Sequence, residues 1–177
     1  MPLLMLAQKQ HANWLPVAAM ELVGKMLSMP YIRVLEVATF YNMYNLAPVG
    51  RFHVQCCTTT PCWLKGSDEV VKACRDTAGV GLGETSRDGL FTLSEVECLG
   101  ACVNAPMLCV ADAQDGSEIF YEDLNYQNTR ELMFALKRGD KPKTGSQSGR
   151  VTSEPAGGLT TLESQRGEYE KKRKQAS

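Results

Sequence analysis

Four of the seven cysteines in this 177-residue chain fall into two short pairs. Four residues separate Cys57 from Cys62, three separate Cys98 from Cys102, and thirty-five lie between the pairs. Each pair lies in a stretch rich in turn-forming residues. Two loops that each deliver two thiolates supply what a [2Fe–2S] cluster requires, which is one cysteine pair for each iron. The spacing therefore predicts an iron–sulfur site in a protein that carries electrons.

Two other chemistries use paired cysteines. A structural zinc site is the first, because four thiolates can complete a tetrahedron around one ion. Zinc ribbons usually leave two residues between paired cysteines, whereas the gaps here are four and three. Thiol–disulfide exchange is the second, but it typically requires a Cys-x-x-Cys motif, which this sequence lacks. The spacing favours the cluster and leaves zinc open.

The residues around the pairs suit a negatively charged cluster. Its sulfides and thiolates carry a charge of about −2, which proteins offset mainly with backbone N–H groups. We expect Gly66 and Gly100 to let the backbone approach the sulfurs closely. The threonines 58–60 offer donors or form a plain turn. Neither loop contains lysine or arginine, which predicts a low reduction potential.

The remaining cysteines fit a packing role. Cys56 precedes Cys57 on a predicted strand, so its side chain should point to the opposite face of the sheet. Cys74 lies on the apolar side of a predicted helix and Cys109 within a predicted buried strand. Free cysteines of this kind commonly behave as small hydrophobic residues. Only Cys56 is close enough in sequence to compete as a ligand.

Composition argues against several classes of function. The formal net charge is −1, whereas nucleic-acid binding requires a basic surface, so no nucleic-acid partner is expected. No apolar run reaches the roughly eighteen residues of a membrane span, and residues 1–7 are too short for a secretion signal. We therefore expect no direct membrane insertion. An odd cysteine count favours a reducing compartment. The glycines at 79–83 precede a predicted strand, so no nucleotide-binding loop is predicted.

The first part of the chain should form a small helical unit. Pro16 suits the start of a helix with apolar residues at roughly helical spacing. Met29-Pro30 ends that helix, because proline lacks the backbone donor and restricts the residue before it. A second helix is expected from Tyr31 to about Met43. We place this domain at residues 1–49.

Residues 50–139 should form a separate α/β domain. The predicted strands cover 52–56, 91–96, 107–110 and 118–121, and the first two lead into the cysteine loops. One helix should begin at Gly66-Ser67 with Ser67 as its cap, and the last at Asn128-Thr129, ending at Gly139. Asp115-Gly116 predicts a hairpin turn. The order β-α-β-β-β-α is that of a thioredoxin-like domain, so the fold class is α+β.

Residues 140–177 are rich in Gly, Pro, Ser and Thr and have no hydrophobic periodicity. Such a segment is either disordered or an extended arm that orders on a partner. The spacing of Val151, Leu159 and Leu162 favours an arm over residues 140–162 that grips a partner without contacting the cluster.

Several motifs together resemble a known family, the thioredoxin-like [2Fe–2S] subunit of respiratory complex I. The resemblance covers roughly residues 12–162. The matching segments are Trp14-Leu-Pro16, Ile32-Arg-Val34, Glu36-Val-Ala-Thr-Phe-Tyr41, Cys57-Thr-Thr-Thr-Pro-Cys-Trp-Leu64, Glu95-Val-Glu-Cys-Leu-Gly-Ala-Cys-Val-Asn-Ala-Pro-Met107, Tyr121-Glu-Asp-Leu124 and Ser153-Glu-Pro-Ala-Gly-Gly-Leu159.

The resemblance implies that Cys57, Cys62, Cys98 and Cys102 bind one [2Fe–2S] cluster. It also implies docking on the flavin-carrying, NADH-binding subunit and on other subunits of the peripheral arm, with FMN held by the partner and not by this chain. The expected activity is that of an oxidoreductase subunit without a complete active site of its own. The expected location is the matrix side of the mitochondrial inner membrane or, alternatively, the cytoplasmic face of a bacterial plasma membrane. An NAD-linked hydrogenase or formate dehydrogenase subunit and a free-standing ferredoxin are the alternatives.

The resemblance also sets out features that can be checked. The family usually has more chain before Trp14, and an aliphatic residue usually stands at the position of Cys56. The stretch 111–118 is longer here than is usual, which predicts an enlarged hairpin loop. In thioredoxin-like domains a cis-proline commonly precedes the hairpin before the last helix. Pro106 occupies that place, so a cis Ala105–Pro106 bond is predicted.

Overall fold

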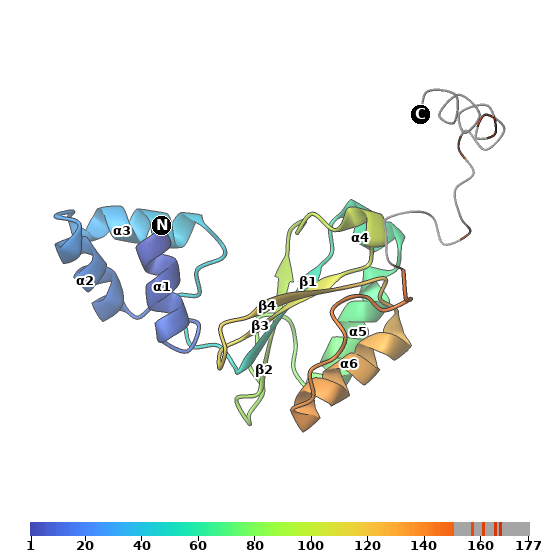
Figure 1. Ribbon diagram of the computed structural model, residues 1–177. Coiled ribbons are helices and arrows are strands. Elements are labelled where there is room, and N and C mark those ends of the chain that lie inside the picture. The colour runs from blue at the N-terminus through green and yellow to red at the C-terminus, as the bar shows by residue number, and fades with distance from the viewer. Residues whose placement is uncertain (151–156, 158–160, 162–164, 166, 168–177) are drawn as a thin grey trace, which may run out of the picture.

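The computed structural model describes residues 1–150 together with Gly157, Thr161, Gln165 and Gly167. Most of the predicted arm, including Val151, Leu159 and Leu162, lies outside the described residues. Within the described part of the chain, no helix has both the length and the apolar character needed to span a bilayer. Figure 1 shows a helical unit beside a domain built on a β-sheet.

The helical unit contains α1 (Pro2–Gln10), α2 (Val17–Met26) and α3 (Tyr31–Phe40). The two prolines predicted to punctuate this region, Pro16 and Pro30, stand directly before α2 and α3 in extended backbone. The second predicted helix, α3, is shorter than expected, because it ends at Phe40 rather than near Met43. The unit has its own core, made by Leu4, Leu15, Met20, Val23, Val34, Ala38 and Tyr44.

Helix α1 was not predicted from the sequence, and polar contacts hold it in place. The side chain of Gln8 is buried and donates to the carbonyl of Met43 at 3.0 Å. Its Oε1 accepts from the backbone N–H of Asn45 at 2.8 Å. A buried amide with both ends paired fixes α1 against the segment after α3.

The second domain has a five-stranded mixed sheet in the order β2-β1-β3-β4-β5. Its strands are β1 (Phe52–Cys57), β2 (Phe91–Val96), β3 (Leu108–Asp112), β4 (Glu118–Glu122) and β5 (Gly145–Ser146). The pairs β1–β2 and β4–β5 are parallel, whereas β1–β3 and β3–β4 are antiparallel. The predicted hairpin joins β3 and β4, and Gly116 in its turn has the left-handed φ of 67° that the turn requires.

Two helices, α5 (Ser67–Ala78) and α6 (Tyr126–Arg138), pack together against the sheet. The shared core contains alternate residues of β1, namely Phe52, Val54 and Cys56, together with side chains of both helices. The intervening residues of β1 face the other side of the sheet, as strand geometry requires. A short helix, α4 (Thr60–Leu64), lies within the first cysteine loop.

The starts of α5 and α6 differ from the prediction. The cap of α5 is Gly66 and not Ser67. Gly66 has a φ of 91°, a conformation that residues with a side chain disfavour. Ser67 is the first residue of the helix and is buried. Helix α6 begins earlier than predicted. Asn125 caps it by accepting from the backbone N–H of Asn128, whose own side chain accepts from the backbone N–H of Asn125. Both residues are good caps, so sequence alone pointed to the wrong one.

The chain turns back after α6, which ends at Gly139 as predicted. We call residues 140–150 the returning segment. Within it, β5 adds a strand to the sheet by pairing Gly145 with Tyr121 and Ser146 with Glu122. The predicted arm therefore begins by packing on its own domain.

Candidate cluster-binding site

Both cysteine loops follow strands that run in the same direction. β1 and β2 are parallel neighbours, and their register places Cys57 opposite Val96, the last residue of β2. Adjacent parallel strands end at the same edge of a sheet, so the loops that follow them emerge side by side. This topology brings Cys57 close to the loop that begins at Glu97.

The first pair of cysteines is buried. Cys57 ends β1 and Cys62 lies on α4, and solvent reaches almost none of either side chain. Cys57 Sγ lies 3.3 Å from the hydroxyl of Thr59. The hydroxyl of Thr58 instead donates to Glu95 Oε1 at 2.5 Å. Of the threonines considered as donors, Thr59 is therefore the one that contacts a cysteine sulfur through its side chain.

The second pair lies at the surface. Cys98 is exposed and Cys102 is half-buried at the start of the short 3-10 helix Cys102–Asn104. Their sulfurs are 3.1 Å apart. The backbone N–H of Gly100 donates to Cys98 Sγ at 3.4 Å, and Gly100 has a φ of 90°. The predicted close approach of the backbone to sulfur is thus confirmed at Gly100, whereas Gly66 serves the start of α5.

The two loops contact each other through backbone amides and small apolar groups. The backbone N–H of Cys57 donates to the carbonyl of Met107 at 3.4 Å. The backbone amide of Leu99, from the second loop, helps to lower the pKa of Cys57, and that of Met107 acts in the same direction on Cys62. Ala105 and Met107 form one buried cluster with Cys57 and Cys62. The Ala105–Pro106 bond between these contacts is cis, which confirms the prediction.

Electrostatics distinguish the thiols. Burial raises the pKa of Cys62 to about 12, and the neighbouring Cys57 and Cys102 contribute to that rise. For Cys57, burial opposes ionisation, but hydrogen bonds from Thr59, Cys62 and Leu99 hold its pKa below the ordinary value. The hydrogen bond with Cys98, together with desolvation, raises the pKa of Cys102. Since only thiolates are strong ligands, a bound cation would be needed to ionise all four.

The donor set fits a [2Fe–2S] cluster. Two loops each supply two thiols, the N–H of Gly100 donates to Cys98 Sγ, and backbone amides near Cys57 and Cys62 act to lower the pKa of these thiols. Soft thiolates and amide donors are what such a cluster uses. Among the described residues, no three His, Cys, Asp or Glu side chains gather closely enough to hold a single metal ion. The sulfurs instead form two pairs.

The other cysteines lie where strand alternation and helix packing predict. Cys56 and Cys74 are buried in the main core with their sulfurs 3.9 Å apart. Cys109 is buried on β3, and its burial and the nearby Glu118 raise its pKa to about 12. All three are buried, and buried free cysteines commonly act as small hydrophobic residues, which fits the packing role.

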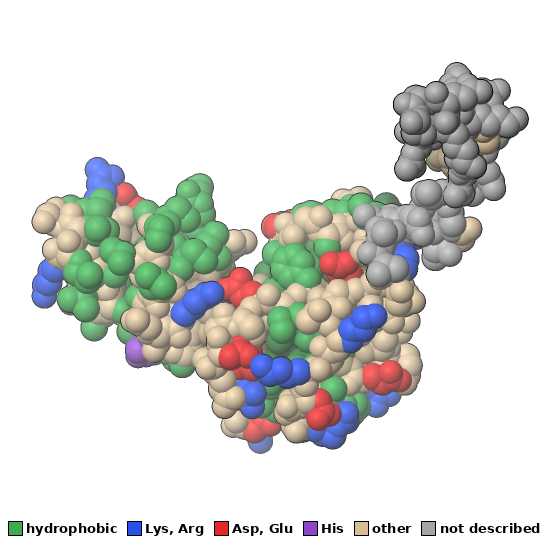
Figure 2. Space-filling view, viewed as in Figure 1, with side chains coloured by type: hydrophobic (Ala, Val, Ile, Leu, Met, Phe, Trp, Pro, Cys, Tyr) green, Lys and Arg blue, Asp and Glu red, His purple; other side chains and the backbone are tan. Residues whose placement is uncertain are grey.

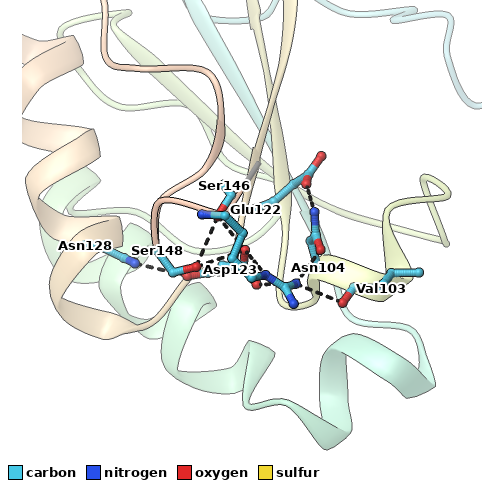
Figure 3. A network of polar contacts seen from close by, with 8 residues as sticks. Val103, Asn104, Glu122, Asp123, Asn128, Ser146 and Ser148 are labelled. Carbon is cyan, nitrogen blue, oxygen red and sulfur yellow. Dashed lines mark hydrogen bonds and ion pairs between the residues drawn. The ribbon is translucent and has the colours of Figure 1, made fainter. Parts of the chain in front are cut away.

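A network of polar contacts behind the second cysteine loop was not predicted. It joins Asn104, Glu122, Asp123 and Arg150, with Ser146 and Ser148 at its edge (Figure 3). The sequence analysis predicted few cations near the cysteines because neither loop contains lysine or arginine. The structure adds one from outside the loops, because Arg150 contacts Val103, the residue after Cys102. The only hint of this network in the sequence was that Asp123 lies in Tyr121-Glu-Asp-Leu124, one of the segments that resemble the family.

Large apolar side chains that follow Cys62 and Cys102 in the sequence are exposed. Trp63 is 59% exposed, Leu64 is 71% exposed and Val103 is 66% exposed. These residues adjoin Cys62 and Cys102 in the sequence. Isolated exposed apolar residues are common, but three beside one site indicate a contact surface.

Comparison with known proteins gives a family and a set of relatives. The family described as "Thioredoxin-like [2Fe-2S] ferredoxin" matches residues 1–137. A subunit of NADH-quinone oxidoreductase from Rickettsia conorii is 54% identical over 137 residues, which are 77% of this chain and 78% of that protein. The corresponding subunit from Rickettsia felis is 54% identical over 133 residues, which are 75% of this chain and 76% of that protein.

Among solved structures, an NAD+-reducing [NiFe]-hydrogenase in the H2-reduced state is similar in fold. The TM-score is 0.64 at 16% identity, and the similarity covers 79% of this chain and 23% of that chain. At this identity the likeness concerns the fold alone.

Proposed function

Because the chain belongs to the thioredoxin-like [2Fe–2S] ferredoxin family, we propose that it is the electron-transfer subunit of an NADH:quinone oxidoreductase. The 54% identity to two bacterial subunits of that enzyme supports this assignment. The observation that carries it is that both cysteine loops leave the same edge of the sheet, because β1 and β2 are parallel neighbours whose register places Cys57 opposite Val96.

We assign Cys57, Cys62, Cys98 and Cys102 as the ligands of the cluster. When bound, the cluster supplies a one-electron carrier. Cys57 and Cys62 anchor its buried side, while the amides of Leu99, Gly100 and Met107 offset the negative charge on the sulfurs. Cys98 and Cys102 hold the side that faces solvent, where a partner can approach.

The partner that we propose is the flavin-carrying subunit that oxidises NADH, with FMN bound there. Trp63, Leu64 and Val103 form an exposed apolar rim beside the cysteines. Figure 2 shows further hydrophobic side chains gathered over the helical unit. The exposed large apolar residues of α2 and α3 include Leu22, Met26, Ile32 and Phe40. A freely diffusing ferredoxin has no need of so much exposed apolar surface, whereas a subunit of an assembly buries it.

An equivalent subunit of an NAD-linked hydrogenase is the second candidate function, because a hydrogenase shares the fold. The identity of 54% to the quinone-reducing enzymes, against 16% to the hydrogenase, favours the first candidate.

The bacterial source of the relatives favours the cytoplasmic face of a bacterial plasma membrane over the mitochondrial inner membrane as the location of the assembly.

The test is the metal content of the purified full-length chain. We expect about two irons and two acid-labile sulfides per chain, and a one-electron paramagnetic signal on reduction. Serine at any of the four assigned positions should abolish or alter that signal, whereas Cys109→Ser is the control that retains it. Stoichiometric zinc without labile sulfide would reject the proposal. Co-purification with a hydrogenase rather than a quinone-linked flavoprotein would favour the second candidate.

A further inference from the structure

The returning segment reaches the loop that carries Cys102. Arg150 lies four residues after β5. Its Nη2 donates to the carbonyl of Val103 at 3.2 Å and also to Asn104 Oδ1. Val103 and Asn104 are the two residues directly after Cys102. A side chain from beyond the last helix thus holds the loop of the second cysteine pair.

Asp123 joins the same loop to the returning segment. Arg150 donates to both of its carboxylate oxygens, from Nε at 3.1 Å and from Nη2 at 2.9 Å. The hydroxyl of Ser146 donates to Asp123 Oδ2 at 2.6 Å. The backbone N–H of Asp123 donates to the carbonyl of Asn104 at 2.7 Å. Figure 3 shows these groups converging on Asp123 from β5 and from the loop of Asn104.

The Arg150–Asp123 pair is sheltered from solvent. The two side chains are 16% and 14% exposed, whereas those of the pair Arg138–Asp140 are 66% and 59% exposed. Sheltered, two-pronged arginine–carboxylate contacts are stronger and more specific than exposed ones. Asp123 also has a φ of 54°, a conformation that a non-glycine residue keeps only when its surroundings hold it. The pair therefore has the features of a built contact.

We propose that Arg150 is a positioning residue for the cluster: through Val103, Asn104 and Asp123 it fixes the loop of Cys98 and Cys102, and its charge sets part of the field at that side of the site. This inference rests on the proposed function, because it assigns a role at the same cluster. Fixing the loop slows the loss of the cluster. The Arg150 cation favours the added electron, and the Asp123 anion disfavours it.

The experiment uses the full-length chain with its cluster and four variants: Arg150→Gln, Arg150→Lys, Asp123→Asn and the control Arg138→Gln. Circular dichroism and the thermal midpoint establish that each variant is folded. Two properties are then measured, namely the rate at which an iron chelator bleaches the cluster and the midpoint potential.

We expect the cluster of Arg150→Gln to be lost about tenfold faster than that of the wild type, the effect typical of losing a charged hydrogen bond. Its potential should fall, whereas that of Asp123→Asn should rise, because the two changes remove opposite charges. Arg150→Lys should keep the potential but lose the cluster faster, since lysine lacks the planar fork. Arg138→Gln should match the wild type in both properties.

The opposite shifts in midpoint potential of Arg150→Gln and Asp123→Asn distinguish the proposed role from a merely structural one. A merely structural role would shift both potentials in the same direction or leave both unchanged. If Arg150→Gln and Arg138→Gln behave alike while the wild type carries its cluster, the inference is overturned and the proposed function stands. Potential shifts of equal sign in Arg150→Gln and Asp123→Asn would also overturn it. A wild-type chain that binds no cluster would overturn both proposals.

Discussion

Two adjacent cysteines on β1 have opposite surroundings. Cys56 faces the core formed with α5 and α6, and Cys57 faces the second cysteine loop. Their difference follows from the alternation of side chains along a strand. A shift of one residue in this strand would exchange a core thiol for a site thiol, so the register of β1 determines which sulfur is available.

The first prediction compares these neighbours. Cys56→Ala should keep the absorption spectrum of the cluster and lose about 1 kcal/mol of the free energy of unfolding, because it removes only a packed sulfur. Cys57→Ala should abolish or change the spectrum. The visible spectrum and iron content of both variants decide the matter. A lost cluster in Cys56→Ala with an unchanged one in Cys57→Ala would show that the ligand is assigned one residue too late.

The second prediction concerns His53, which is buried on β1 with Nε2 2.7 Å from Ser94 Oγ. Burial lowers its pKa from 6.5 to about 4. The unfolded chain therefore binds the proton first, so the stability is complete above pH 6.5 and declines as the pH falls towards 4. By about pH 5 the loss from this group alone should be about 2 kcal/mol.

His53→Gln should flatten that decline between about pH 7 and pH 5, as measured by urea unfolding at each pH. The other titrating groups are common to both chains, so the difference between the two curves isolates His53. Parallel curves would mean that folding does not lower the pKa of His53.

At this scale the sequence indicates the candidate ligands but not the contacts behind them. The assignment of four cysteines as ligands is a proposal from spacing and resemblance, whereas the burial of the other three follows from strand alternation and helix packing, which are local signals. The contacts of Arg150 with Val103 and Asp123 join residues 47 and 27 positions apart. No periodicity encodes such distant pairs, so they become visible only when the sheet is assembled.

Among the structural elements, the turn between Cys98 and Cys102 depends on one glycine. Gly100 has a φ of 90°, and its N–H bonds to Cys98 Sγ. Gly139, at the end of α6, has a similar φ of 85° far from the cysteines in the sequence. In both places an added Cβ meets open space, so strain in the backbone is the expected cost.

The third prediction uses this matched pair. Gly100→Ala and Gly139→Ala should each lose about 1 kcal/mol of the free energy of unfolding. Only Gly100→Ala should also change the electron paramagnetic resonance spectrum of the reduced cluster, because it moves an amide that donates to a ligand. Identical spectra for the two variants and the wild type would argue against a role of the Gly100 amide.

The elements themselves were predicted with uneven success, for physical reasons. The four longer strands and the main helices have strong hydrophobic periodicity. The cap of α6 was misplaced because Asn125 and Asn128 bond reciprocally and either sequence position suits a cap. The two-residue β5 exists only because β4 offers an edge to pair with, and α1 is held by the buried Gln8. Whether such short or weakly patterned elements form depends on contacts with other parts of the fold.

For the whole molecule, the fourth prediction concerns two truncations. Removing residues 151–177 should weaken co-purification with the flavin-carrying subunit, because the apolar residues spaced along this stretch cannot form a core of their own. It should leave the rate of cluster loss unchanged, since Arg150 remains. Removing residues 140–177 should weaken co-purification equally and also speed cluster loss. Undiminished assembly in both truncated chains would leave the segment without a docking role.

The contact between Arg150 and the loop of Cys102 also orders events during synthesis. The helical unit has its own core, so it can fold while the rest of the chain is being made. The second cysteine loop is different, because its restraint lies 48 positions after Cys102, beyond the last helix of the sheet domain. The residues up to Arg150 must therefore have left the ribosome before this restraint on the loop can form.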